Sequence, residues 1–144
     1  MTAISTILRE KGGQVETVLA DTGIAEAVSL LAQKRIGALV VLDARKRLSG
    51  IISERDIVRA LAEHGAAALD MDVGSLMTRK VVTCIGEDTV DEVMGVMTSG
   101  RFRHAPVMEG DSLVGLVSIG DVVKYKIAEA TAEAEALKTY ISAG

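Results

Sequence analysis

Two stretches of the chain, one in each half, carry apolar residues at the same spacing. These residues recur at i, i+3, i+4 and i+7, and they are Ile24, Ala27, Val28 and Leu31, followed by Val90, Val93, Met94 and Met97. This spacing places each set on one face of a helix. Thr89 and Glu92 form a capping-box pattern before the second helix, and Gly23 and Glu26 occupy the corresponding places before the first. The pattern therefore predicts two amphipathic helices in equivalent positions.

Each predicted helix is followed by two short apolar runs that a charged, glycine-containing turn separates, which is typical of a β-hairpin. A short extended segment precedes each helix, and a second helix follows each hairpin. The predicted strands cover 16–19, 38–42 and 49–53, then 81–85, 105–108 and 113–118; the second helices cover 54–63 and 119 to about 137, and 66–73 connects the two copies. Each copy is thus a βαββα unit.

The sequence from Gly50 to Arg59 lies over Gly115 to Lys124 without a gap and preserves a glycine, a serine and an aspartate. A unit of about 60 residues buries too little apolar surface to be stable alone. We therefore expect an α/β (α+β) fold in which two repeats pack with pseudo-two-fold symmetry and form equivalent clefts where they meet. The expected boundaries are 1–70 for the N-terminal segment and first repeat, 71–130 for the second repeat, and 131–144 for a helical extension. A homodimer is also expected.

The composition of the chain argues against several classes of function. Apolar residues make up 49% of the chain, aromatic residues 2%, and the formal net charge is −4, which argues against disorder and against nucleic-acid binding. The single cysteine, Cys84, excludes an intramolecular disulfide or a multi-cysteine zinc site, and it is expected to be a small buried apolar residue. No apolar run is long enough for a membrane span, and residues 1–14 lack the features of a secretory signal. We therefore expect a cytoplasmic protein that does not associate with membranes.

The strand-to-helix corners at Ser53 and Ser118 have two interpretations. A serine N-cap with an aspartate three residues on, Asp56 or Asp121, is a capping box. The same geometry also suits a ribose phosphate, because helix N-terminal amides and the serine hydroxyl can contact phosphate while the carboxylate accepts hydrogen bonds from two ribose hydroxyls. Both interpretations can hold at once.

Basic residues are unequally distributed between the copies. Arg101, Arg103 and His104 stand where the second copy enters its strand, and either a solvated helix C-terminus or phosphate neutralisation would explain them. The first copy has Gly37-Ala38 opposite Arg103-His104, but it carries Arg55 where the second has Gly120. The two sites should therefore differ, with the second the more readily occupied. No histidine has metal-ligand neighbours, so no metal is expected, and familiar catalytic motifs are absent.

The two corners, together with Ile36 to Val41 and Phe102 to Val107, resemble a tandem cystathionine-β-synthase (CBS) domain pair, the Bateman module. Val73 to Thr78 resembles the family's entry into a repeat. The resemblance implies an adenosine-containing ligand in the clefts between repeats: AMP first, with ADP, ATP, NAD(H) or S-adenosylmethionine as alternatives. It further implies that the aspartates hold ribose, the serines contact phosphate or ribose, and apolar residues enclose the adenine. The implied ligand-binding residues are Thr17, Ile36, Gly37, Ala38, Leu39, Ser53, Arg55 and Asp56, and Thr83, Arg101, Phe102, Arg103, His104, Ala105, Pro106, Ser118 and Asp121.

Three functional hypotheses follow. The first is a non-catalytic sensor of adenosine nucleotides that signals to a separate effector protein. The second is a ligand-free dimerisation or scaffold module in which the corners only cap helices. The third, an enzyme acting on a nucleotide, has the least support, because two histidines and one cysteine leave few candidates for a base or nucleophile.

Overall fold

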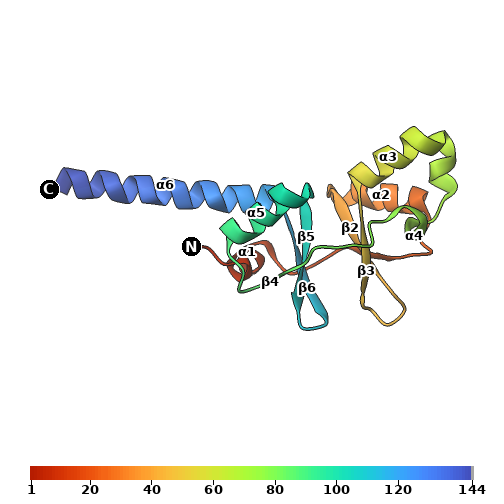
Figure 1. The fold of residues 1–144 in the computed structure, drawn as a ribbon, viewed down its shortest axis with the longest axis horizontal. Coiled ribbons are helices and arrows are strands. Elements are labelled where there is room, and N and C mark those ends of the chain that lie inside the picture. Colours follow the sequence, from red (N-terminus) through yellow and green to blue (C-terminus); the bar gives the residue numbers. More distant parts are fainter. Residues whose placement is uncertain (144) are drawn as a thin grey trace. The chain divides into compact units, whose positions relative to one another are not determined.

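The computed structural model describes residues 1–143 and divides the chain into two compact units (Figure 1). The first-repeat unit contains residues 14–82 and 110–113. The second-repeat unit contains residues 1–13, 83–109 and those from Val114 onward. Each unit contains a three-stranded sheet with helices against it, so the fold is the mixed α/β arrangement expected from the sequence.

The sheet of the first-repeat unit has the order β1-β2-β3. Strand β1 (Thr17–Leu19) pairs in parallel with β2 (Ala38–Leu42), and β2 pairs antiparallel with β3 (Leu48–Ser53). The remaining elements are α2 (Ile24–Lys34), α3 (Glu54–His64), the 3-10 helix η1 (Gly65–Asp70) and α4 (Val73–Leu76). The predicted apolar face of α2 supplies Ile24, Ala27 and Leu31 to the core.

The sheet of the second-repeat unit repeats this order as β4-β5-β6. Its strands are β4 (Cys84–Ile85), β5 (His104–Glu109) and β6 (Ser112–Ser118), and its helices are α1 (Ile4–Lys11), α5 (Val90–Gly100) and α6 (Ile119–Ala143). Val90, Val93 and Met97 of α5 are buried, as their spacing predicted. The capping box between Thr89 and Glu92 is also confirmed, whereas the equivalent N-cap, Gly23, has no side chain with which to cap α2.

Helix α1 is an element that the hydrophobic pattern did not predict. Its Ile4 and Ile7 are fully buried in the core of the second-repeat unit, so the residues before the first repeat complete the core of the second. The first backbone amides of α1 are satisfied, because Ile4 donates to the Asp88 carbonyl (2.8 Å) and Ser5 to the Gly86 carbonyl (2.9 Å). These contacts hold α1 against the loop that precedes α5.

The glycine shared by both repeats marks a close approach in each unit. A Cβ on Gly50 would lie 2.8 Å from the Met77 sulfur and 2.8 Å from the Thr78 carbonyl oxygen. A Cβ on Gly115 would lie 2.5 Å from a methyl group of Leu8 in α1. Each sheet therefore has a residue without a side chain where the segment preceding a repeat crosses it.

Some elements differ in extent from the sequence prediction. The segment 66–73, predicted only as a connector, lies in η1 and reaches the start of the short helix α4, and the predicted strand 81–85 is reduced to Cys84–Ile85. Helix α6 continues to Ala143, beyond the predicted end near Leu137, because alanine and glutamate favour helix throughout its second half. Every residue from 130 to 143 is exposed, and Figure 1 shows this part of α6 extending beyond the other elements of its own unit.

Candidate functional site

The first candidate corner lies where β3 runs directly into α3. Ser53 is the N-cap, and the backbone amide of Asp56 donates to its Oγ (3.3 Å). In return, Asp56 Oδ2 accepts hydrogen bonds from the Ser53 amide (2.9 Å) and hydroxyl (3.1 Å). The predicted capping box is therefore present, and it fixes the orientation of the Asp56 carboxylate at the helix N-terminus.

A third residue, Thr78, completes the first corner. Its hydroxyl donates to Asp56 Oδ1 (3.2 Å). Its backbone pairs with Ile51 of β3 in both directions, with N–O distances of 2.8 and 3.0 Å. The segment after α4 therefore contributes a neutral donor to the Asp56 carboxylate and a backbone donor to the Ile51 carbonyl.

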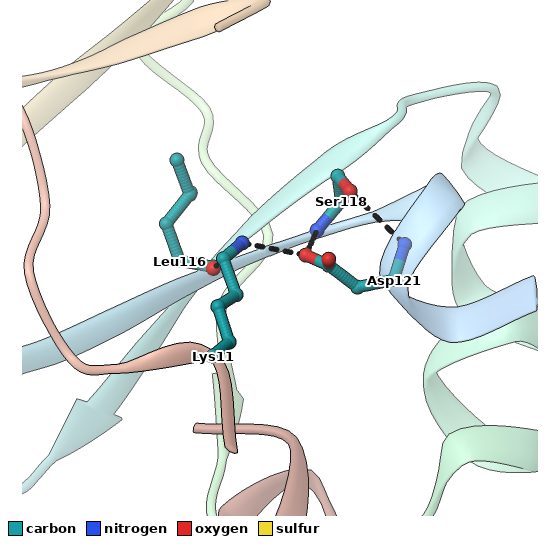
Figure 2. Close-up of polar contacts among 4 residues, drawn as sticks. All are labelled: Lys11, Leu116, Ser118 and Asp121. Carbon is teal, nitrogen blue, oxygen red and sulfur yellow. Dashed lines mark hydrogen bonds and ion pairs between the residues drawn. The ribbon is translucent and has the colours of Figure 1, made fainter. Parts of the chain in front are cut away.

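The second corner has the same local geometry where β6 runs into α6 (Figure 2). The Ser118 amide donates to Asp121 Oδ2 (2.9 Å), and the Asp121 amide donates to Ser118 Oγ (3.1 Å). Both side chains are partly buried. The reciprocal bonds again orient a carboxylate at a helix N-terminus, so the capping interpretation holds at both corners.

The third component of the second corner is a lysine from α1. Lys11 Nζ lies 2.6 Å from Asp121 Oδ2 and 2.9 Å from the carbonyl oxygen of Leu116, so the ammonium bridges a side chain and the backbone of β6 (Figure 2). Burial of Asp121 would by itself raise the pKa of its carboxyl group, but the hydrogen bonds from Lys11 and Ser118 outweigh this effect and lower the pKa. Asp121 is therefore a carboxylate at neutral pH.

The two corners differ in what satisfies the same pair of acceptors. Leu116 occupies the place in the second repeat that Ile51 occupies in the first, and Asp121 corresponds to Asp56. Thr78 satisfies the first pair with an amide and a hydroxyl. At the second corner, the single ammonium group of Lys11 donates to both acceptors.

Sequence reasoning missed both Lys11 and Thr78 as corner residues. The sequence does contain a signal for them. Val73 to Thr78 leads into the second repeat, and residues 7–12 stand at the equivalent place before the first repeat, since the offset between the two segments equals that between Thr17 and Thr83. The sequence does not reveal that each entry segment packs in the unit of the other repeat.

Other predicted site residues lie beside the corners. The Gly37 carbonyl accepts a hydrogen bond from the Glu54 amide (3.0 Å), and the Arg103 carbonyl accepts one from the Ile119 amide (2.7 Å). These bonds tie the segment entering β2 or β5 to the first residue of α3 or α6. Thr17 at the start of β1, and Thr83 just before β4, are exposed.

The predicted apolar and basic residues vary widely in exposure. Leu39 and Ala105 belong to β2 and β5 and are buried within their units, and Ala38 and Pro106 beside them are buried too. Ile36, Gly37, Phe102 and His104 are partly exposed, whereas Arg55, Arg101 and Arg103 are exposed. Only the partly or fully exposed members of this set present their side chains at the surface of a unit.

An arginine with a positive φ angle ends the first helix of each repeat. Arg35 after α2 has a φ of 55°, and Arg101 after α5 has a φ of 56°. Glycine usually occupies this left-handed position, because a side chain there costs energy. In each repeat, an arginine therefore occupies a strained left-handed position immediately before Ile36 or Phe102.

Residues 1–143 contain neither a metal-binding cluster nor a membrane-spanning helix. No cluster of three or more histidine, cysteine, aspartate or glutamate side chains with the geometry of a metal site occurs among them. Within the same range, no helix has the length and apolar character of a membrane span.

Comparison with protein families identifies both repeats. A sequence model of the CBS domain matches residues 7–63 and 73–128. The CBS domain-containing protein CBSX3, mitochondrial, of Arabidopsis thaliana is 35% identical over 151 residues, which cover 99% of this chain and 73% of the relative.

Solved structures share this fold over most of the chain. The CBS-domain containing protein ATU1752 from Agrobacterium tumefaciens is 47% identical, with a TM-score of 0.85 over 87% of this chain and 93% of that chain. The CBS domain pair of protein MJ0100, in complex with 5′-methylthioadenosine and S-adenosyl-L-methionine, is 27% identical, with a TM-score of 0.80 over 90% of this chain and 98% of that chain.

Proposed function

The chain belongs to the CBS-domain family, and on that premise we propose that it is a regulatory, non-catalytic module that binds an adenosine-containing nucleotide at its two corners. CBS-pair proteins are typically regulatory. The MJ0100 pair was crystallised with two ligands that both contain adenosine. The observation that carries the proposal is the pair of oriented carboxylates, Asp56 and Asp121, each fixed at a helix N-terminus by a serine amide.

The geometry suits a ribose with an attached phosphate. Each carboxylate has two oxygens that can accept hydrogen bonds from the vicinal ribose hydroxyls. The serine hydroxyl and the first backbone amides of α3 or α6 lie at the helix N-terminus, where the positive end of the helix dipole favours a phosphate group. Arg55 at the first corner, and Arg101, Arg103 and His104 near the second, add basic groups that favour an anionic ligand.

AMP is the ligand that we propose first, because it is the smallest nucleotide that uses the ribose and phosphate contacts together. ADP, ATP, NAD(H) and S-adenosylmethionine share the adenosine part and differ beyond it. The adenine would lie against the residues that enter β2 and β5, with Thr17 or Thr83 beside it. We propose that binding signals to a separate effector protein, and a cytoplasmic location stays a prediction because the Arabidopsis thaliana relative is named as mitochondrial.

Equilibrium dialysis of the purified protein against AMP, ADP, ATP, NAD, NADH and S-adenosylmethionine tests the proposal. We expect at least one of these ligands to bind below millimolar concentration. If none does, the nucleotide-binding function is wrong and the scaffold alternative gains support.

A second candidate function, dimerisation, rests on a specific feature of α6. Apolar residues recur along this helix at alternating intervals of four and three residues, and they are Val123, Ile127, Ala130, Ala134, Leu137 and Ile141. Ile127, Leu137 and Ile141 are 61%, 59% and 67% exposed. This is the heptad spacing of a two-stranded coiled coil.

A second copy of the chain is the proposed partner for this stripe. In a parallel pair of helices, Glu133 of one copy and Lys138 of the other would occupy the flanking positions where opposite charges meet. Sedimentation analysis of Leu137→Glu, with Thr139→Glu on the far side of α6 as the matched control, tests the pairing. We expect the first variant to be monomeric and the control dimeric; a dimeric Leu137→Glu variant would exclude this interface.

A further inference from the structure

Lys11 occupies the acceptors of the second corner. Its ammonium lies 2.6 Å from Asp121 Oδ2 and 2.9 Å from the Leu116 carbonyl oxygen, and its side chain is 38% exposed (Figure 2). Neither the repeat pattern nor the family comparison assigns a role to this residue. It comes from α1, far from Asp121 in the sequence, and it reaches the corner from the last turn of that helix.

The hydrogen-bonding capacity of Asp121 is limited. A carboxylate oxygen accepts about two hydrogen bonds. Oδ2 already receives two donors, the Ser118 amide at 2.9 Å and the Lys11 ammonium at 2.6 Å. A ribose diol that binds both oxygens of the carboxylate therefore needs the position at Oδ2 that Lys11 holds.

The Asp56 carboxylate at the first corner receives hydrogen bonds from neutral groups. The donors to Asp56 that the structure shows are the Ser53 amide and hydroxyl and the Thr78 hydroxyl, at 2.9, 3.1 and 3.2 Å. Hydroxyl groups can rotate to another acceptor and can themselves accept a hydrogen bond from a ligand. An ammonium can only donate, and it loses a charge-assisted bond when it leaves a carboxylate.

We propose that Lys11 is a built-in competitor of the ligand at the second corner, an inference that rests on the proposed nucleotide-binding function. A ribose that binds Asp121 displaces the ammonium from Oδ2 and releases the C-terminal end of α1. The start of the helix stays in place, because Ile4 and Ile7 are fully buried in the core. Ligand occupancy is thereby coupled to the position of the residues that connect α1 to the first repeat.

Calorimetric titration with adenosine tests the competition. Adenosine has the diol but no charge, so loss of the Lys11 charge does not change any attraction to phosphate. The variant is Lys11→Met, and the matched control is Arg9→Met, which removes a cation from the same helix where its side chain contacts only Thr6 among the hydrogen bonds shown. A further variant, Lys11→Met with Asp121→Ala, assigns the binding to the second corner.

We expect Lys11→Met to bind adenosine about 1.4- to fivefold tighter than the wild type, because this is the factor that the contribution of an exposed ion pair corresponds to. Arg9→Met should bind like the wild type, and the double variant should lose the gain. Equal or weaker binding by Lys11→Met would overturn the competition while leaving the nucleotide-binding function intact. If no variant binds adenosine or AMP at millimolar concentration, the proposed function fails and this inference fails with it.

Acetylation of lysines in the wild type gives a second measurement that needs no variant. Saturating adenosine should increase the acetylation rate of Lys11 relative to that of Lys138 in the exposed half of α6, as measured by mass spectrometry. An unchanged ratio at saturation would show that the ammonium stays on Asp121 and would overturn the proposal.

Discussion

The equivalent glycines Gly50 and Gly115 provide a matched pair of stability measurements. A Cβ at Gly50 would lie 2.8 Å from the Thr78 carbonyl oxygen, which belongs to a backbone that exchanges two hydrogen bonds with Ile51. A Cβ at Gly115 would meet only side-chain atoms of Leu8, at 2.5, 2.9 and 3.2 Å. Leu8 is partly exposed and can rotate, whereas the Thr78 backbone cannot move without breaking its bonds.

The magnitudes follow from these contacts. In Gly50→Ala, loss of the two Ile51–Thr78 hydrogen bonds costs about 1–3 kcal/mol, at about 0.5–1.5 kcal/mol each. Alanine is intrinsically more favourable than glycine in a strand by about 0.5–1 kcal/mol, which leaves a net loss of about 0–2.5 kcal/mol, centred near about 1 kcal/mol. In Gly115→Ala, a displaced Leu8 rotamer costs about 0.5–1.5 kcal/mol, and the same intrinsic gain brings the net effect to between a gain of about 0.5 kcal/mol and a loss of about 1 kcal/mol.

Urea denaturation and thermal melting, both followed by circular dichroism, compare the two variants with the wild type. We expect Gly50→Ala to be the less stable of the two, with a melting temperature lowered by about 2–4 °C for each kcal/mol lost. A Gly115→Ala variant that loses more stability than Gly50→Ala, or a Gly50→Ala variant equal to the wild type, would refute the reasoning.

Three further predictions concern single side chains. The pKa of Asp121 is lowered in the folded state, so its carboxylate stabilises the fold at neutral pH, and this contribution is lost as the pH falls below about 4. In acid denaturation, the free energy of unfolding of Asp121→Asn should therefore change less over that range than that of the wild type. Thr89→Ala removes an N-cap and should lower the free energy of unfolding by about 0.5–2 kcal/mol in urea titration, and a loss below that range would mean that the capping box contributes little. Burial, with a smaller effect of Asp88, raises the pKa of the Cys84 thiol to about 12, so Ellman's reagent should react with it only after denaturant is added; fast reaction of the folded protein would contradict its burial.

Local patterns in the sequence predicted most of the repeat fold. The spacing of Val90, Val93 and Met97 gave the face of α5 that is buried, and Ala38 to Leu42 matches β2 at both ends. The gapless alignment of the repeats placed Asp56 and Asp121 at equivalent corners. These features are short-range and occur twice, so one sequence is enough to find them.

The features that the sequence did not predict depend on long-range packing. Helix α1 has only eight residues and a short apolar face, and its burial follows from its place in the core cluster of the second-repeat unit rather than from its own sequence. The ion pair between Lys11 and Asp121 joins residues far apart in the chain. Hydrogen bonds between an entry segment and the sheet it crosses leave no periodic signal, so Lys11 and Thr78 became visible only in the structure.

Thermal melting with and without AMP, in the wild type and in Asp121→Ala, tests the central claim most directly. Because the substitution also removes a helix cap, the quantity to compare is the shift that AMP produces in each protein. At a hundredfold excess over its dissociation constant, AMP should add about 2.7 kcal/mol and raise the melting temperature of the wild type by several degrees. We expect this shift to fall clearly in Asp121→Ala; no shift in the wild type, or an equal shift in both proteins, would contradict a nucleotide site built on this carboxylate.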